Sequence, residues 1–127
     1  MSAAADFRAA VEAADHAGMV ATLSPEIVFH SPVTFRPFEG RDAVGHVLAG
    51  VMRVFKDFRY TDELEAAGAT ALVFRARVGD REAEGIDLIR EGPDGLIEDF
   101  TVLVRPLSAL QALAEAMARE LGAAPPS

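Results

Sequence analysis

Four polar side chains lie on predicted strand faces that are otherwise apolar: Ser31, Asp62, Asp87 and Glu98. Asp and Glu are seldom buried without a partner, because removing the charged form from water is costly. Several such groups facing inward therefore favour a pocket with apolar walls and a few converging polar groups. A carboxyl group placed there could act as a general acid or anchor a ligand, and burial should raise the pKa of Asp87. Tyr60 shares its predicted strand face with Asp62 and joins this set.

His30 and Ser31 stand at the end of a short apolar strand, directly before Pro32. Because the ordinary pKa of histidine lies near neutrality, His30 is the candidate general base if the strand end twists inward. Ser31 would then lie at the pocket wall, and Phe35 and Phe38 would help to close the pocket.

Each polar residue also has a purely structural interpretation. A serine before a proline is typical of a turn hydroxyl, which would account for Ser31, and His30 could face outward. Asp87 could pair with an arginine near a hairpin. Asp62 and Glu98 lie near predicted strand ends, where a slip of one residue would turn them to solvent.

The periodicity of the apolar residues predicts the elements that must position these groups. A helical segment over about 5–23, with a break near 15–18, is stopped by Ser24 and Pro25, and a second helix covers about 41–55. Strands are expected at about 27–31, 58–66, 70–78, 82–91 and 96–105, with glycine-containing turns between the last four. A last helix opens with a capping-box pattern at Ser108 and Gln111 and ends at Gly122.

This order predicts one α+β domain over residues 1–122, with 123–127 as a flexible tail. A cone-shaped, curved antiparallel sheet would wrap around the N-terminal helices and leave a cavity between them, and the C-terminal helix would be an addition. The apolar side chains expected to line this cavity are Phe7, Phe29, Phe38, Phe74, Phe100 and Val102. The methionines at 19, 52 and 117 have helical core spacing and are interpreted as core filler.

Charge and composition exclude several classes of function. The 127 residues carry a net charge of −8, from 12 basic and 20 acidic residues, which disfavours nucleic acid and membrane surfaces as partners. The absence of cysteine excludes disulfides and thiolate chemistry. The histidines show no metal-ligand spacing and no glycine-rich phosphate loop is present, so we expect neither metal nor organic cofactor. Uncharged stretches reach about half the ~20 residues of a membrane helix, and a cytoplasmic protein is expected.

The element order and the segment HAGMVATLSPEIVFHSPVTFRPFEGRDAVGHVLAGV resemble the nuclear transport factor 2-like superfamily. That superfamily contains the ketosteroid isomerases and the SnoaL-like polyketide cyclases. It covers about residues 5–105. Further cues are the Gly-Arg-Asp that opens the helix at 41 and the final hairpin that ends in DGLIEDFTVLV. Because this fold hosts both enzymes and non-catalytic modules, the resemblance indicates the fold more than the reaction.

The isomerase pattern implies three site residues. Its aspartate base directly precedes the proline of the short strand, where this chain has Ser31, and its tyrosine donor lies in the first helix, where this chain has Phe7. Its protonated aspartate donor, in the penultimate strand, matches Asp87 in EGIDLIREG. One of the three is retained, and His30 is the neighbouring residue that could replace the base.

The related epoxide hydrolases need two carboxylates with an arginine between them, but the strand arginines fall on the outer face.

Two hypotheses follow from these observations. The first is a small enzyme of isomerase, cyclase or hydrolase type, or an enzyme-like domain, that binds a compact apolar molecule carrying a carbonyl, with Asp87 as anchor or general acid. The second is a non-catalytic ligand-binding or association module that forms a homodimer through the outer face of the sheet. The residues expected on that face are Arg75, Arg77, Glu82, Glu84, Ile86, Leu88 and Leu103. A cavity that reaches Asp87 would favour the first hypothesis, and an interior filled by phenylalanines the second.

Overall fold

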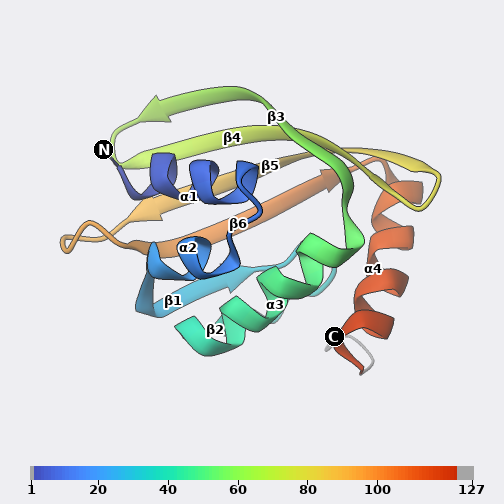
Figure 1. Ribbon diagram of the computed structural model, residues 1–127, viewed down its shortest axis with the longest axis horizontal. Helices are drawn as coiled ribbons and strands as arrows, with labels where there is room; N and C mark the ends of the chain where they lie inside the picture. Colours follow the sequence, from blue (N-terminus) through green and yellow to red (C-terminus); the bar gives the residue numbers. More distant parts are fainter. Residues whose placement is uncertain (1, 123–127) are drawn as a thin grey trace.

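The computed structural model of the chain describes residues 2–122, and the tail predicted at 123–127 lies outside the described residues. The elements are α1 (Ala3–Glu12), α2 (His16–Ala21), β1 (Leu23–His30), β2 (Phe38–Glu39), α3 (Arg41–Val54), β3 (Lys56–Ala66), β4 (Ala69–Val78), β5 (Arg81–Glu91), β6 (Ile97–Arg105) and α4 (Leu107–Leu121). Figure 1 shows a mixed α+β arrangement in which the helices gather beside one curved, unclosed sheet. This confirms the predicted fold class.

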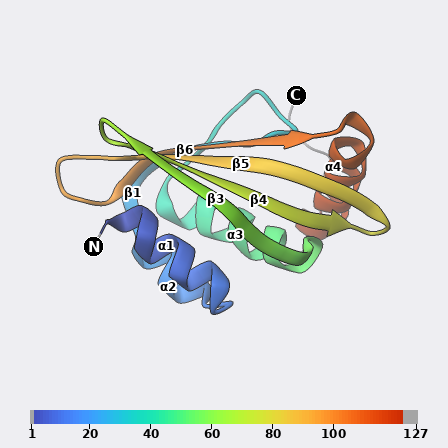
Figure 2. The same cartoon turned by 90° about the horizontal axis from the view of Figure 1, so that it is seen from above.

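Within residues 2–122 the sheet has six strands in the order β2-β1-β6-β5-β4-β3. The last four strands pair antiparallel as consecutive hairpins, as the alternation predicted, whereas β1 lies parallel to β6. Seen from above, α1, α2 and α3 lie on one side of the sheet and α4 stands at one end (Figure 2). The side that faces the helices is called the inner face below, and the other side the outer face.

The first helical segment is divided earlier than the sequence predicts. The chain leaves α1 at Ala13 and Ala14, and Ala14 has a positive φ of 53°. Asp15 does not lie in a break, because its side chain accepts a hydrogen bond from the Gly18 amide and caps α2. The two helices pack against each other beside the inner face of the sheet (Figure 2), with Phe7 and Met19 buried.

Strand β1 begins four residues before its predicted start. Leu23 pairs with Ile97 of β6, and the Ile97 amide donates to the Thr22 carbonyl, so the neighbouring strand extends β1 backward. The register is irregular between Leu23 and Val28. Pro25, which has no amide hydrogen to donate, therefore lies where regular strand pairing does not require one. The short strand β2 was not predicted.

The last two helices differ in how well the sequence predicts them. Helix α3 has the predicted bounds within one residue and buries the predicted stripe, including Val44, Val47 and Leu48. Helix α4 begins one residue before its predicted cap. Pro106, which is extended, takes the N-cap position without any side-chain hydrogen bond, so the expected capping box at Ser108 is wrong. No helix within residues 2–122 is long and apolar enough to cross a membrane.

Candidate ligand-binding site

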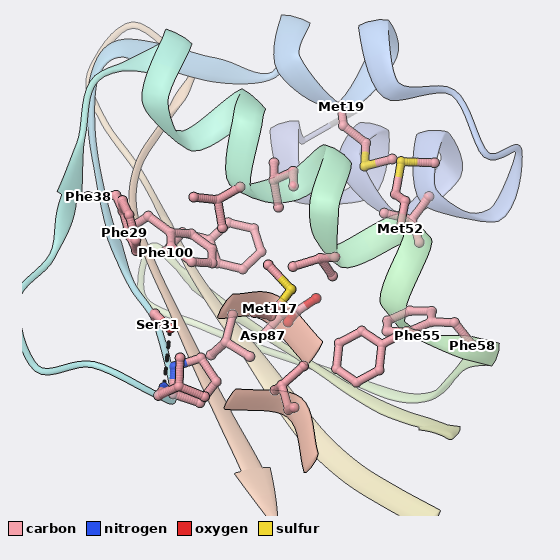
Figure 3. A pocket seen from close by; sticks show the side chains of 18 of the residues that line it. Met19, Phe29, Ser31, Phe38, Met52, Phe55, Phe58, Asp87, Phe100 and Met117 are labelled. Carbon is pink, nitrogen blue, oxygen red and sulfur yellow. Dashed lines mark hydrogen bonds between the residues drawn. The ribbon is translucent and has the colours of Figure 1, made fainter. Parts of the chain in front are cut away.

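A cavity of about 530 Å³ lies between the inner face of the sheet, the three N-terminal helices and α4. Its walls are almost entirely apolar, and aromatic and methionine side chains project into it (Figure 3). A volume of this size lies within the roughly 300–1,000 Å³ that is typical of small-molecule sites. The predicted cavity is therefore present, and the phenylalanines surround it without filling it.

Asp87 is the buried acidic residue of this cavity. It lies on the central strand β5, in register with Leu72 of β4 and Val102 of β6, and its side chain points to the inner face. Only 6% of the residue is exposed. Figure 3 shows the carboxyl group beside Met117, with Phe100 to one side and Phe55 to the other. The carboxyl group is thus held away from bulk water by apolar side chains.

Tyr60 is the hydrogen-bonding partner of this carboxyl group. Tyr60 lies on the edge strand β3, and its hydroxyl donates across β4 to Oδ2 of Asp87 at 3.0 Å. Burial raises the pKa of Asp87 to about 7, although the hydrogen bond from Tyr60 acts in the opposite direction. The pKa of Tyr60 is itself raised, first by burial and then by the nearby negative charge of Asp87. The pair therefore holds a carboxyl group that titrates near neutral pH.

Two groups of aromatic rings form the walls on either side of Asp87. On one side Phe7 meets Phe100 edge-to-face at 5.1 Å, and Phe29 lies 5.3 Å from Phe100. On the other side Phe58 stacks on Phe74 at 4.8 Å, with Phe55 and Tyr60 beside them. These rings offer flat apolar surfaces that suit a flat or ring-containing ligand.

Gly85 allows one of these walls to form. It lies on β5 opposite Phe74, and a Cβ at this position would lie 2.2 Å from Cζ of the Phe74 ring and 2.6 Å from the Leu103 carbonyl oxygen. Only glycine leaves the space in which the Phe74 ring lies across β5, two residues from Asp87. The glycine therefore shapes the cavity beside its carboxyl group.

Most of the side chains predicted for the site do line the cavity. They are Phe7, Phe29, Ser31, Phe38, Tyr60, Phe74, Asp87, Phe100 and Val102. Ser31 also has the structural role of a turn hydroxyl before a proline, since its hydroxyl accepts a hydrogen bond from the Val33 amide at 3.2 Å. Asp87 makes no ion pair with an arginine, and no arginine is among the described residues that line the cavity.

The inner-face positions predicted for Asp62 and Glu98 are wrong, because a β-bulge reverses the alternation at each place. Between Tyr60 and Asp62 the register shifts by one residue, so Asp62 pairs with Val73 and is exposed. A second shift leaves Glu98 without a paired residue, and Ile97 is buried in its place. Neither carboxylate lies at the cavity.

His30 also lies outside the cavity. Its neighbour Phe29 points inward, and the His30 ring is on the opposite side of β1, where Nε2 lies 3.1 Å from Oδ2 of Asp99. Both side chains are more than a third exposed. The structure does not bring His30 near Asp87, and its outward-facing interpretation is the one that the geometry supports.

Several lining residues were missed from the sequence. Helix α4 contributes Leu113, Met117, Ala118 and Leu121, although it lies beyond the part of the chain that carried the resemblance. The methionines at 19, 52 and 117 were interpreted as core filler but also face the cavity. Glu12 and His46, both exposed, line its rim. The helical spacing of the three methionines predicts that they face inward, but the sequence pattern does not distinguish a packed core from a cavity wall.

Metal ligation finds no support in the described residues. Between residues 2 and 122 the structure brings together no group of three or more His, Asp or Glu side chains that could hold an ion. The polar groups in the buried part of the cavity include the carboxyl group of Asp87 and the hydroxyl of Tyr60.

The chain is similar to known proteins both in its sequence family and in its structure. The model of the SnoaL-like domain matches residues 4–102. A crystal structure described as a steroid delta-isomerase from Pseudomonas aeruginosa is 43% identical, with a TM-score of 0.90, over 94% of this chain and 89% of that chain. A protein from Silicibacter pomeroyi, described as uncharacterized with a cystatin-like fold, is 34% identical, with a TM-score of 0.90, over 94% of this chain and 85% of that chain.

More distant structures share the fold. A SnoaL-like protein of unknown function from Burkholderia thailandensis is 14% identical, with a TM-score of 0.69, over 81% of this chain and 92% of that chain. An NTF2-like protein of unknown function from Cytophaga hutchinsonii is 16% identical, with a TM-score of 0.65, over 84% and 89%. No match is found among the curated proteins.

Proposed function

Because this chain belongs to the SnoaL-like domain family, we propose that its cavity binds an uncharged lipophilic molecule and orients it through a carbonyl oxygen. The observation that supports this proposal most strongly is the buried Asp87, bonded to Tyr60 in a cavity that is otherwise apolar. A single polar group among apolar walls fixes the orientation of a ligand, while the walls supply most of the binding free energy.

The protonation state of Asp87 selects the ligand. A carboxyl group with a pKa of about 7 is largely protonated in mildly acidic solution and can then donate a hydrogen bond to an acceptor on the ligand. A carbonyl oxygen is such an acceptor and carries no charge into the cavity. An anionic ligand would meet no arginine or lysine among the described lining residues, so its desolvation beside Asp87 would go uncompensated.

A finer form of this proposal is that the protein also catalyses a proton transfer on the bound ligand. The similarity to a protein described as a steroid delta-isomerase supports it. A protonated Asp87 would stabilise negative charge that develops on the carbonyl oxygen, as an oxyanion hole does. The place of the isomerase base, however, holds Ser31, and His30 lies outside the cavity. We therefore propose binding and polarisation of the carbonyl as the function of the residues present.

Paired ligands with and without a carbonyl test this function. We expect wild-type protein to bind 2-tetralone and progesterone, measured by calorimetry, and to bind tetralin, which has the 2-tetralone skeleton without the oxygen, at least about tenfold more weakly than 2-tetralone. Asp87→Leu should remove that difference and leave tetralin binding unchanged. Equal affinity of the wild-type protein for 2-tetralone and tetralin would contradict the proposed role of Asp87.

A gain of activity tests the finer form. With a 5-ene-3-ketosteroid as substrate, the conjugated product is followed by its ultraviolet absorbance. We expect turnover by the wild-type protein near background and a rise in Ser31→Asp, because that change places a carboxylate base on the cavity wall. Rapid turnover by the wild-type protein would show instead that another residue serves as the base.

A second candidate function, association of two copies, is favoured by the outer face of the sheet. Leu103 is 55% exposed there, next to the half-buried Ile86 and Leu88. At one end of this face Glu84 is held between Arg75 and Arg105, at 3.4 and 3.2 Å. An apolar centre with charged groups of both signs at its edge suits pairing with a second copy of the same face. We propose a homodimer through this surface.

A further inference from the structure

Arg8 of α1 lies over the ring of the tyrosine that holds Asp87. Its guanidinium carbon is 5.5 Å from the centre of the Tyr60 ring, which is cation–π distance. Two carboxylates fix the guanidinium there: Nη1 donates to Glu63 Oε1 at 3.0 Å, and Nε donates to Glu12 Oε2 at 3.3 Å. The arrangement connects a helix, an edge strand and the buried acid in one chain of contacts.

Tyr60 needs such a support, because its own strand provides few contacts on the side of the ring that faces Arg8. Among the described residues, strand β3 is at the edge of the sheet and pairs only with β4. The β-bulge directly after Tyr60 breaks the regular pairing, and residues 61–68 are exposed. The Tyr60 ring touches Phe58 within its own strand, at 5.0 Å edge-to-face, and Arg8 is the contact that reaches it from α1.

We propose that Arg8 is a positioning residue for the site: clamped by Glu12 and Glu63, it holds the Tyr60 ring so that the hydroxyl points at Asp87. The inference rests on the proposed function in that Asp87 is the group that meets the ligand. Arg8 touches neither the cavity nor Asp87 in this arrangement and acts through Tyr60. The bulge lets Glu63 follow Tyr60 toward the helices, since it pairs with the buried Leu72.

The charged groups that face Tyr60 and Asp87 are few. Helix α1 presents Arg8 and Glu12, and β3 presents Glu63. Helix α3 contributes His46 at the rim of the cavity, while the described side chains that α2, α4, β4 and β6 turn toward the cavity are uncharged. The positive charge of Arg8 and the negative charge of Glu12 act on Tyr60 in opposite directions. The pKa of Asp87 is shifted by burial and by the hydrogen bond from Tyr60, so the position of the Tyr60 ring is what Arg8 contributes.

The sign of the effect distinguishes positioning from simple support of the fold. The hydrogen bond from Tyr60 lowers the pKa of Asp87 because it favours the ionised carboxylate. If Arg8 positions Tyr60, removing Arg8 weakens that bond and the pKa of Asp87 rises further. If Arg8 merely keeps the helix packed, removing it admits water to the cavity, burial decreases, and the pKa falls.

The test is the titration of the Asp87 carboxyl carbon by NMR in ligand-free protein, with Asp87→Asn to assign the signal. We expect Arg8→Met to raise the pKa by about half a pH unit, the size of a cation–π contact at a partly exposed site. Tyr60→Phe should raise it more. Arg77→Met is the matched control, because Arg77 makes a similar ion pair with Asp57 away from Tyr60, and it should change nothing.

The double variant Arg8→Met with Tyr60→Phe decides the mechanism. If Arg8 acts through Tyr60, the double variant titrates like Tyr60→Phe alone, because effects within one chain of contacts are not additive. An additive rise would mean that the Arg8 charge acts directly, and a fall or no change in Arg8→Met would mean structural support only; each result overturns the proposal. Should Arg8→Met fail to fold, Arg8→Lys keeps the charge without the planar fork and should show a smaller rise.

The outcome is independent of ligand binding. A protein that shows this coupled titration but binds no carbonyl probe keeps the inference about Arg8 and loses the proposed function. A protein that binds 2-tetralone through Asp87, but whose Asp87 pKa is unchanged in Arg8→Met, keeps the proposed function and loses the inference about Arg8.

Discussion

The Tyr60 hydroxyl donates a 3.0 Å hydrogen bond to the carboxyl group of Asp87, which is only 6% exposed on the central strand of the sheet. The two residues come from β3 and β5, strands that are not adjacent, and their side chains meet on the inner face across β4. Burial and hydrogen bonding act on Asp87 in opposite directions, and burial is the larger effect. The site thus keeps a carboxyl group protonated close to neutral pH.

Asp87→Asn should stabilise the protein, and more so as the pH rises. The pKa of Asp87 is about 7 in the folded protein against an ordinary value of 3.8, so the native state retains a proton that the unfolded chain has lost. The contribution of Asp87 to stability is therefore fully present below pH 4 and is lost as the pH rises through 7. The substituted asparagine side chain stays neutral at every pH and avoids this loss, which amounts to up to about 4 kcal/mol at pH 8.

Urea unfolding of both proteins at pH 5, 6, 7 and 8 measures this difference. The gap in the free energy of unfolding should widen up to about pH 7 and then level off. Asp80→Asn, which removes a carboxylate whose side chain is 98% exposed and whose ion-pair partner is an arginine, serves as control and should not show this profile. A gap that is constant with pH would mean that Asp87 is ionised in the folded protein.

The cavity beside Asp87 should accept a larger side chain at the cost of ligand binding. Val102 pairs with Asp87 across β5 and β6, is only partly buried, and lines the cavity. Val102→Phe directs a ring into open space, so we expect the melting temperature to be maintained or raised while the affinity for 2-tetralone falls at least about tenfold. Val73→Phe, on the outer face, should leave the affinity unchanged. Unaltered binding in Val102→Phe would place the ligand elsewhere.

The alternation of apolar residues predicted the hairpins, the curved sheet and most of the cavity wall, because each strand has one buried face. It failed for Asp62 and Glu98. A bulge inserts one residue and reverses every later position on its strand, and the sequence shows no mark of it. At the second bulge the adjacent residues Leu96 and Ile97 are both apolar, so two registers fit the pattern equally well.

The pairing of Tyr60 with Asp87 could not be predicted either. Both were assigned to inner faces, but their contact depends on the curvature that brings β3 over β5, and no local pattern encodes curvature. The role of α4 in lining the cavity could not be predicted for the same reason. Its buried stripe of Ala109, Leu113 and Met117 is that of any packed helix, and only its position at the end of the sheet makes it a wall.

Gly85→Ala should destabilise the protein and distort the cavity. The added methyl group would overlap the Phe74 ring and the Leu103 carbonyl, and the backbone carbonyl cannot move aside without breaking the pairing of β5 with β6. We expect a loss of roughly 3 kcal/mol in the free energy of unfolding, measured in urea. Gly92→Ala is the matched control, because its Cβ meets the far ends of two exposed side chains, Glu98 and Asp94, and no backbone atom. Equal effects of the two substitutions would show that Phe74 is free to move.

Leu103→Glu tests association through the outer face of the sheet. The residue is 55% exposed at the centre of the proposed interface, and a carboxylate on each copy would bring like charges together without a partner. Sedimentation should show a dimer for the wild-type protein and a dissociation constant at least about tenfold higher for the variant. Leu107→Glu is the control, since Leu107 is 68% exposed at the start of α4 and belongs to no strand of the sheet. A wild-type protein that sediments as a monomer at high concentration would rule out this dimer, and the cavity, which faces the other side of the sheet, would then have to function in a single chain.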